Sequence, residues 1–222
     1  MTRTCALFEG GPGRPAVLFV GDSHAGVLKP EMREMGRRHD VTVLLKVRNC
    51  DAGRYGETAF CSEAIRGAVA DEARRRGVTA VAALSYWDEG LFDTRSLARD
   101  VAVLGETQAR FIVETVPFHP SYDPVLRLAA YQGGAALDTQ GMSVAELDAA
   151  QGGLANTLGE AAREADARLL RPRDHLCGPE RCDYVEDGKL LYFDSNHLTL
   201  AGARRLRPLL DEIARGATAH NM

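Results

Sequence analysis

Residues 18–26 read LFVGDSHAG. The apolar run breaks at Gly21 and then presents an acid, a hydroxyl and an imidazole in Asp22, Ser23 and His24. Such a run is typical of a buried parallel strand that ends in a functional turn. The stretch alone leaves three interpretations open: a nucleophilic serine, a pair of metal ligands, or a polar turn.

The rest of the chain alternates between strand and helix patterns. Short apolar runs predict strands at 16–20, 41–47, 78–84, 109–116 and 168–170. Apolar spacing predicts helices at 25–38, 62–77, 94–106, 154–167 and 200–216. This alternation implies right-handed crossovers and a parallel three-layer α/β/α sandwich. We expect one domain over residues 1–222, with an irregular insertion at about 118–153 that forms a loop and a helix around MSVAELDAAQ.

A second polar cluster, YFDSNH at 192–197, precedes the last predicted helix. Asp194 and His197 are three residues apart, so one loop can carry both into the same cleft. In parallel sheets ligands bind at the carboxyl ends of the strands, where Ser23 also lies. A serine nucleophile needs a general base and a carboxylate that fixes the tautomer of that base. The sequence therefore predicts that Ser23 and His197 meet across the sheet.

Composition and charge restrict the class of protein. The 222 residues are 45% hydrophobic and 26% charged, as in ordinary soluble globular proteins. The net charge is −4, and the arginines are interspersed with acids, so we expect no nucleic-acid partner. We also expect no cofactor and no metal. The sequence does not indicate an oligomeric state.

The cysteines favour an oxidising compartment, whereas the lack of long apolar segments favours the cytosol. No uncharged apolar run reaches the roughly 18 residues of a membrane span, and MTRTCALFEG lacks a secretory signal, which favours a cytosolic chain. Cys50 with Cys61, and Cys177 with Cys182, form two close pairs that suit disulfides in an oxidising compartment, and Cys5 is left over. Their spacing fits zinc poorly. A separate membrane-spanning part next to this chain would remove the conflict.

The motifs taken together resemble a known family. GDSHAG near the start and DSNHLTLAGA near the end are similar to the SGNH (GDSL-type) hydrolase superfamily. More closely, the chain resembles the SGNH domain fused to acyltransferase family-three membrane proteins, which O-acylate cell-surface polysaccharides. The cysteine pairs, the strand ending ALSYW, CGPERC and DGKLLYFDSNHL extend this resemblance over nearly the whole chain.

The resemblance implies a flavodoxin-like sheet with a catalytic triad. In it, Ser23 is the nucleophile, His197 the base and Asp194 the carboxylate that orients the base. The backbone N–H of Ser23 contributes to the oxyanion hole, where a donor typically supplies about 3 to 4 kcal/mol in acyl transfer.

The expected asparagine of the oxyanion hole has no counterpart, because no G-x-N-D block occurs and SYW, ending at Trp87, stands in its place. The candidates for the oxyanion hole or for substrate contacts are therefore Gly21, Asp22, His24, Asn49 and Trp87. Among these, Asp22 also suits a helix cap, and His24 and Trp87 also suit packed positions. The nucleophile elbow of α/β-hydrolases, G-x-S-x-G, does not fit because residue 25 is alanine.

Two other functions compete with acyl transfer. A metallophosphoesterase would use Asp22, His24 and His197 as metal ligands, but the further carboxylates of a two-metal site are missing. A catalytically idle glycan-binding module would keep the fold, although it would not need all three residues of the triad.

We therefore predict a serine-dependent O-acetyltransferase or acetylesterase that acts through an acyl-serine intermediate. Its expected substrate is a carbohydrate or another O-acylated small molecule, and a membrane acyltransferase domain is the expected acyl donor. The family and the cysteine pairs favour an extracytoplasmic setting.

Overall fold

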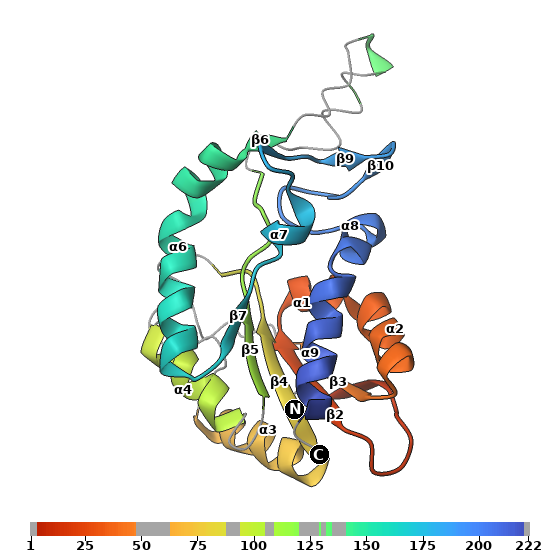
Figure 1. Cartoon of the computed structure of the whole chain (residues 1–222), viewed down its shortest axis with the longest axis vertical. Helices are drawn as coiled ribbons and strands as arrows, with labels where there is room; N and C mark the ends of the chain where they lie inside the picture. Colours follow the sequence, from red (N-terminus) through yellow and green to blue (C-terminus); the bar gives the residue numbers. More distant parts are fainter. Residues whose placement is uncertain are drawn as a thin grey trace.

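A six-stranded sheet with order β1-β3-β2-β4-β5-β7 forms the centre of the molecule (Figure 1). The computed structural model describes residues 4–47, 63–87, 94–104, 109–119, 129, 132–134 and 141–219. The strands are β1 (Cys5–Phe8), β2 (Ala16–Gly21), β3 (Thr42–Val47), β4 (Val78–Leu84), β5 (Ala109–Val113) and β7 (Arg168–Leu170). All neighbours from β3 to β7 pair in parallel. This order of parallel strands is the flavodoxin-like order that the resemblance implies, so the predicted fold class is confirmed.

The edge strand β1 departs from the prediction. It pairs antiparallel with β3, so the sheet is mixed rather than wholly parallel. The strand has four residues, of which two are exposed and two half-buried. Such a short, partly exposed segment lacks the continuous apolar run that identifies a buried strand.

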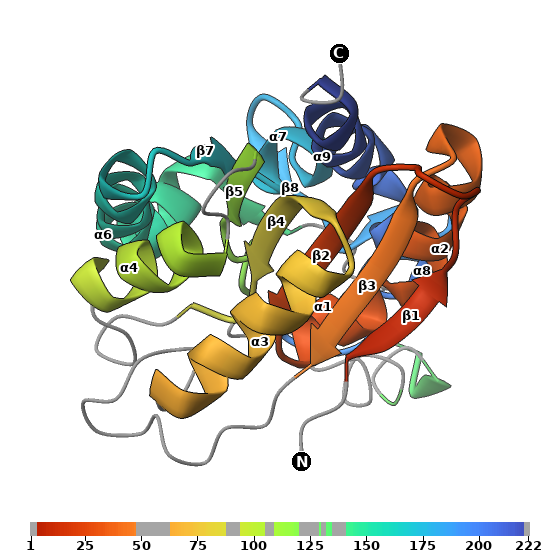
Figure 2. The same cartoon turned by 90° about the horizontal axis from the view of Figure 1, so that it is seen from below.

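Helices cover both faces of the sheet, which makes the three layers visible in Figures 1 and 2. On one side lie α1 (Ser23–Val27), α2 (Lys29–His39), α8 (Leu200–Arg205) and α9 (Arg207–Ala219). On the other side lie α3 (Glu63–Arg75), α4 (Thr94–Leu104) and α6 (Val144–Glu164). Each set packs its apolar residues against one face, and the buried residues form two separate core clusters. None of the described helices is both long and apolar enough to span a membrane.

Two of the predicted helices are each divided in two, and a proline follows each break. The predicted helix 25–38 breaks at Leu28, and α2 has Pro30 in its first turn. The predicted helix 200–216 breaks at Leu206, before Pro208. Proline has no backbone N–H and its ring collides with the carbonyl four residues earlier, so it fits only the first turn of a new helix.

Helix α6 shows the opposite difference, because it joins two predicted helices into one of 21 residues. Ser143 and Glu146 form a capping box at its start. The pair Gly152–Gly153 lies inside the helix, at a cost of roughly 1 kcal/mol for each glycine. Burial of Leu147, Leu154 and Leu158 along one stripe offsets this cost.

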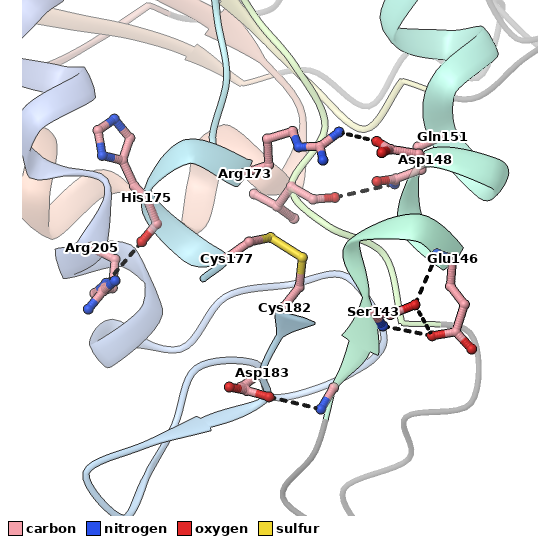
Figure 3. The surroundings of a disulfide bond; sticks show 12 residues. Ser143, Glu146, Asp148, Gln151, Arg173, His175, Cys177, Cys182, Asp183 and Arg205 are labelled. Carbon is pink, nitrogen blue, oxygen red and sulfur yellow. Dashed lines mark hydrogen bonds and ion pairs between the residues drawn. A yellow bond between two sulfur atoms is a disulfide. The ribbon is translucent and has the colours of Figure 1, made fainter. Parts of the chain in front are cut away.

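A disulfide joins Cys177 and Cys182 in the segment that follows β7 (Figure 3). Cys177 ends the short helix α7 (Arg173–Leu176), and Cys182 belongs to β8 (Arg181–Cys182), which pairs with β6 (Met142–Ser143). The chain then forms the hairpin of β9 (Val185–Glu186) and β10 (Lys189–Leu190). Cys5 is a free, exposed thiol. The predicted pair Cys50 and Cys61 lies outside the described residues, as do 120–128, 130–131 and 135–140 of the predicted insertion.

Replacing both cysteines of this disulfide should lower stability. The crosslink closes a loop with a sequence separation of 5, for which loss of the constraint on the unfolded chain costs about 2 kcal/mol. Cys177→Ser/Cys182→Ser should therefore melt roughly 4 to 8 °C below the wild type. Cys5→Ser, the matched control, should melt with the wild type. Equal melting of the double variant and the control would contradict this expectation.

Candidate active site

Ser23 occupies the switch point of the sheet. It directly follows β2 and Asp22, and it begins helix α1. Since β2 pairs with β3 on one side and β4 on the other, the chain leaves β2 where the strand order reverses. Crevices at such points are the usual ligand sites of doubly wound sheets. The hydroxyl-bearing side chain of Ser23 is exposed there.

Gly21 allows the strands to come close beside the serine. A Cβ atom at this position would lie 1.7 Å from the carbonyl oxygen of Leu84 in β4 and 2.8 Å from the Cβ of Ala25. Any side chain would therefore push β4 or α1 away. The structure gives Gly21 this packing role.

Asp22 fixes the turn from two directions. Its Oδ1 accepts a hydrogen bond from the backbone N–H of His24 at 2.9 Å, so it caps α1 as the sequence suggested. Its Oδ2 accepts from the backbone N–H of Tyr86, just beyond β4, also at 2.9 Å. The carboxylate thus joins the first turn to the neighbouring strand end.

The loop that carries Asp194 and His197 is held from several sides. Tyr192 and Leu198 form an isolated antiparallel bridge at its base. The N–H of Phe193 donates to the carbonyl of His197 at 3.0 Å. The N–H of His119, beyond β5, donates to the carbonyl of Ser195 at 2.8 Å. Two contacts within the loop and one from the distant segment beyond β5 therefore fix it over the carboxyl edge of the sheet.

Ser23, His197 and Asp194 form a continuous hydrogen-bonded chain. The Oγ of Ser23 lies 2.8 Å from Nε2 of His197, and Nδ1 of His197 lies 2.8 Å from Oδ2 of Asp194. An ionised carboxylate can only accept, so Nδ1 carries the proton and Nε2 is free to accept from the serine hydroxyl. The arrangement can therefore activate the serine as a nucleophile.

The second carboxylate oxygen of Asp194 accepts two hydrogen bonds that stabilise its negative charge. Oδ1 accepts from the backbone N–H groups of Asn196 at 2.9 Å and His197 at 2.7 Å. Partial burial raises the pKa of the Asp194 carboxyl, but these two donors and the His197 ring outweigh it and hold the pKa below its usual range. Asp194 is therefore ionised at neutral pH and can orient the imidazole.

His24 lies beside this chain rather than within it. Its side chain is buried, and its ring centroid lies 4.4 Å from that of His197 and 5.3 Å from that of Tyr86. Burial lowers the pKa of His24 to about 4, and the neighbouring His197 contributes in the same direction. His24 is therefore a neutral, packed ring at neutral pH, with little surface left for substrate.

Trp87 requires a correction, because its indole does not face the site. The side chain is 2% exposed and belongs to the core cluster under α3, α4 and α6. Its Nε1–H donates to the carbonyl of Val113 at 2.7 Å, and its backbone N–H donates to Oγ1 of Thr115. Neither N–H is thus directed at an oxyanion. Asn49 lies outside the described residues.

Sequence reasoning did not identify three of the residues that build the site. Tyr86 supplies the backbone donor to Asp22, Phe193 stacks on His197 with ring centroids 5.3 Å apart, and His119 holds the loop through its backbone. Tyr86 and Phe193 stand next to the singled-out Trp87 and Asp194, and this adjacency was the available signal. The role of His119 depends on tertiary structure alone.

Two of the three candidate metal ligands have polar atoms that are already engaged in other hydrogen bonds. Both carboxylate oxygens of Asp22 accept backbone N–H groups, and Nδ1 of His197 is bonded to Asp194. Within the ranges that the structure describes, no group of three His, Cys, Asp or Glu side chains is arranged to hold a metal ion. The geometry fits a nucleophilic serine better than it fits these ligands.

A doubly wound sheet with a serine after its first parallel strand and Asp-x-x-His before its last helices defines an SGNH-type domain. A family model described as "SGNH domain (fused to AT3 domains)" matches residues 2–212. The chain therefore belongs to this family, as its motifs suggested. No curated protein sequence matches the chain significantly.

Two solved structures are similar. The periplasmic domain of the Salmonella ser. Paratyphi A lipopolysaccharide acetyltransferase is 15% identical, with a TM-score of 0.59 over 92% of this chain and 82% of that one. The C-terminal catalytic domain of Streptococcus pneumoniae peptidoglycan O-acetyltransferase A, with a methylsulfonyl adduct, is 11% identical, with a TM-score of 0.41 over 93% and 96%. The first likeness shows a shared fold.

Asp194→Asn should reduce activity strongly without unfolding the protein. An amide in place of the carboxylate can donate to the imidazole and favour the wrong tautomer, which lowers kcat by about 10⁴-fold in related arrangements. The measurement is hydrolysis of p-nitrophenyl acetate. Asp187→Asn is the matched control, because Asp187 sits at φ 47 in the exposed β9–β10 turn, where asparagine is equally suited. Similar rates for both variants would argue against the role of Asp194.

His24 should make stability depend on pH. Its pKa of about 4 in the folded state lies below the unfolded value of 6.5, so the unfolded state binds more protons between these values. The stabilisation is complete above about pH 6.5 and is lost as the pH falls, by about 3 kcal/mol at pH 4. The free energy of unfolding, measured with urea at pH 4 to 8, should fall more steeply toward low pH in the wild type than in His24→Phe. Parallel curves would show that His24 is not the titrating group.

Proposed function

We propose that this domain transfers an acyl group, most simply acetyl, on a carbohydrate hydroxyl through an acyl-Ser23 intermediate. The observation that carries the proposal is the hydrogen-bonded chain from Ser23 through His197 to Asp194 at 2.8 Å for each link. The exposed position of Ser23 leaves its oxygen accessible to a substrate carbonyl.

In the first half of the reaction, Nε2 of His197 takes the proton of Ser23 while Oγ attacks the acyl carbonyl. Asp194 stabilises the imidazolium that forms. The backbone N–H of Ser23 belongs to the first turn of α1, where amides have no partner within the helix, and it is a donor for the oxyanion. The imidazolium then protonates the departing oxygen, which leaves the acyl group on Ser23.

In the second half, His197 removes a proton from the incoming hydroxyl, which attacks the acyl-serine, and the imidazolium returns the proton to Oγ of Ser23 as the acyl–Oγ bond breaks. Water gives an esterase, and a sugar hydroxyl gives an O-acyltransferase. The same residues serve both reactions. The family description, an SGNH domain fused to AT3 domains, supports transfer with a membrane acyltransferase domain as donor. The name of the Salmonella neighbour, a lipopolysaccharide acetyltransferase, supports a glycan acceptor.

An extracytoplasmic setting accompanies this proposal. The disulfide Cys177–Cys182 is of a kind that persists in oxidising compartments. The Salmonella neighbour is described as a periplasmic domain. A domain outside the membrane would have direct access to surface glycans.

The test labels the protein with a serine-directed phosphonate and measures p-nitrophenyl acetate hydrolysis, with and without a chelator. Wild type should hydrolyse the ester and gain one adduct on Ser23, while Ser23→Ala should lose the adduct and nearly all turnover. Ser195→Ala is the control, because its hydroxyl is not the one bonded to His197. Addition of an oligosaccharide acceptor should divert acetyl from water to the sugar.

Three outcomes would overturn the proposal. Activity that survives Ser23→Ala but vanishes with chelator would favour a metal-dependent esterase. An adduct and hydrolysis without any transfer to sugars would leave an esterase. Neither adduct nor hydrolysis would favour a glycan-binding module.

A further inference from the structure

Two aromatic rings pack against the imidazole of His197. The His24 ring lies 4.4 Å away between centroids and is tilted by 33°, and the Phe193 ring lies 5.3 Å away and is nearly parallel, at 22°. His24 directly follows the proposed nucleophile, and Phe193 directly precedes Asp194. Each half of the site thus contributes one ring to the base.

The main chain that carries each ring is held by a hydrogen bond. The N–H of His24 is bonded to the carboxylate of Asp22, and the N–H of Phe193 is bonded to the carbonyl of His197. The His24 ring is also packed against Tyr86. The backbone of both residues is therefore fixed beside the imidazole, and the His24 ring is also enclosed by its neighbours.

The His24 ring offers a π-surface rather than a charge at neutral pH. It is 5% exposed, and burial is the main reason that it resists protonation. The charged groups around it are Asp22 on its own turn and Asp194 and His197 on the opposite loop. Glu114, paired with Arg171, lines the same small hollow as His24.

Phe193 lies on the outer side of the site. Its side chain is 50% exposed. Its ring stacks on the His197 ring while the rest of the side chain remains at the surface.

A cation gains free energy next to the face of an aromatic ring within about 6 Å of its centroid, and at exposed sites this amounts to about two- to fivefold in an equilibrium constant. His197 becomes such a cation when it accepts the proton of Ser23. Both ring centroids lie inside this distance. The gain exists only in the protonated state and therefore favours the reaction step rather than the resting enzyme.

We propose that His24 and Phe193 are positioning residues of the base, whose rings orient the His197 imidazole and stabilise the imidazolium formed when Ser23 gives up its proton. This inference rests on the proposed function, in which His197 is the general base. It assigns the histidine of GDSH a role distinct from both base and metal ligand.

The experiment distinguishes the effect of an aromatic π-surface from the effect of side-chain volume. His24→Phe keeps an aromatic ring, whereas His24→Leu keeps the apolar bulk without the π-surface. Phe193→Tyr and Phe193→Leu form the same pair at the surface, where folding is not at risk. Val103→Ala, an exposed apolar side chain on α4, is the control that should match wild type.

The rate of p-nitrophenyl acetate hydrolysis is measured against pH. Each leucine variant should lose about two- to fivefold in kcat, and the midpoint of its acidic limb should move to lower pH by about half a unit, because the imidazolium is less stable. The phenylalanine and tyrosine variants should retain both values. Leucine variants that match their aromatic partners in rate and midpoint would overturn the proposal.

An NMR titration of the His197 ring in the same variants provides a readout that needs no turnover. The leucine variants should titrate at lower pH than their aromatic partners. If the wild type fails to hydrolyse the ester or to take up phosphonate, the proposed function fails, yet the titration still decides whether the rings stabilise the imidazolium. Identical titrations in all variants would refute the stacking role even in an active enzyme.

Discussion

The carboxylate of Asp22 is the contact on which the site depends. One oxygen caps α1 and so sets where the helix begins, and the other binds the backbone of Tyr86 beyond β4. Together with the close approach that Gly21 permits, this fixes the serine between two parallel strands. The loop of His197 then needs only to reach the same edge, and the parallel sheet ensures that it does.

All five strands of the central sheet that pair in parallel could be predicted from the sequence, because buried strands leave continuous apolar runs. Two helices that the pattern predicted as unbroken are each divided in two. The breaks precede α2 and α9, which both have a proline in the first turn. The pattern also predicted a break at Gly152–Gly153, although the buried leucines of α6 carry the helix through. Local pattern shows which residues are apolar, but packing determines whether a helix bends or continues.

Some residues of the site could likewise be predicted from the sequence, and others could not. Ser23, Asp194 and His197 could be proposed because their chemistry is concentrated in two short motifs, and the structure brings them together. Trp87 could not be placed, because a residue just beyond a strand end can face the crevice or the core, and here it faces the core. The ring contacts of His24 and Phe193 arise between segments that only the fold makes adjacent.

The separation of 174 residues between Ser23 and His197 has a consequence for the newly made chain. Translation delivers Ser23 well before His197, so a polypeptide made only as far as β3 carries a serine without its hydrogen-bond partner. The hydrogen-bonded chain from Ser23 to Asp194 forms only after β7 and the loop of Asp194 and His197 have been made and docked. In the proposed mechanism, the fold therefore delays the reactivity of Ser23 until the loop of Asp194 and His197 is in place.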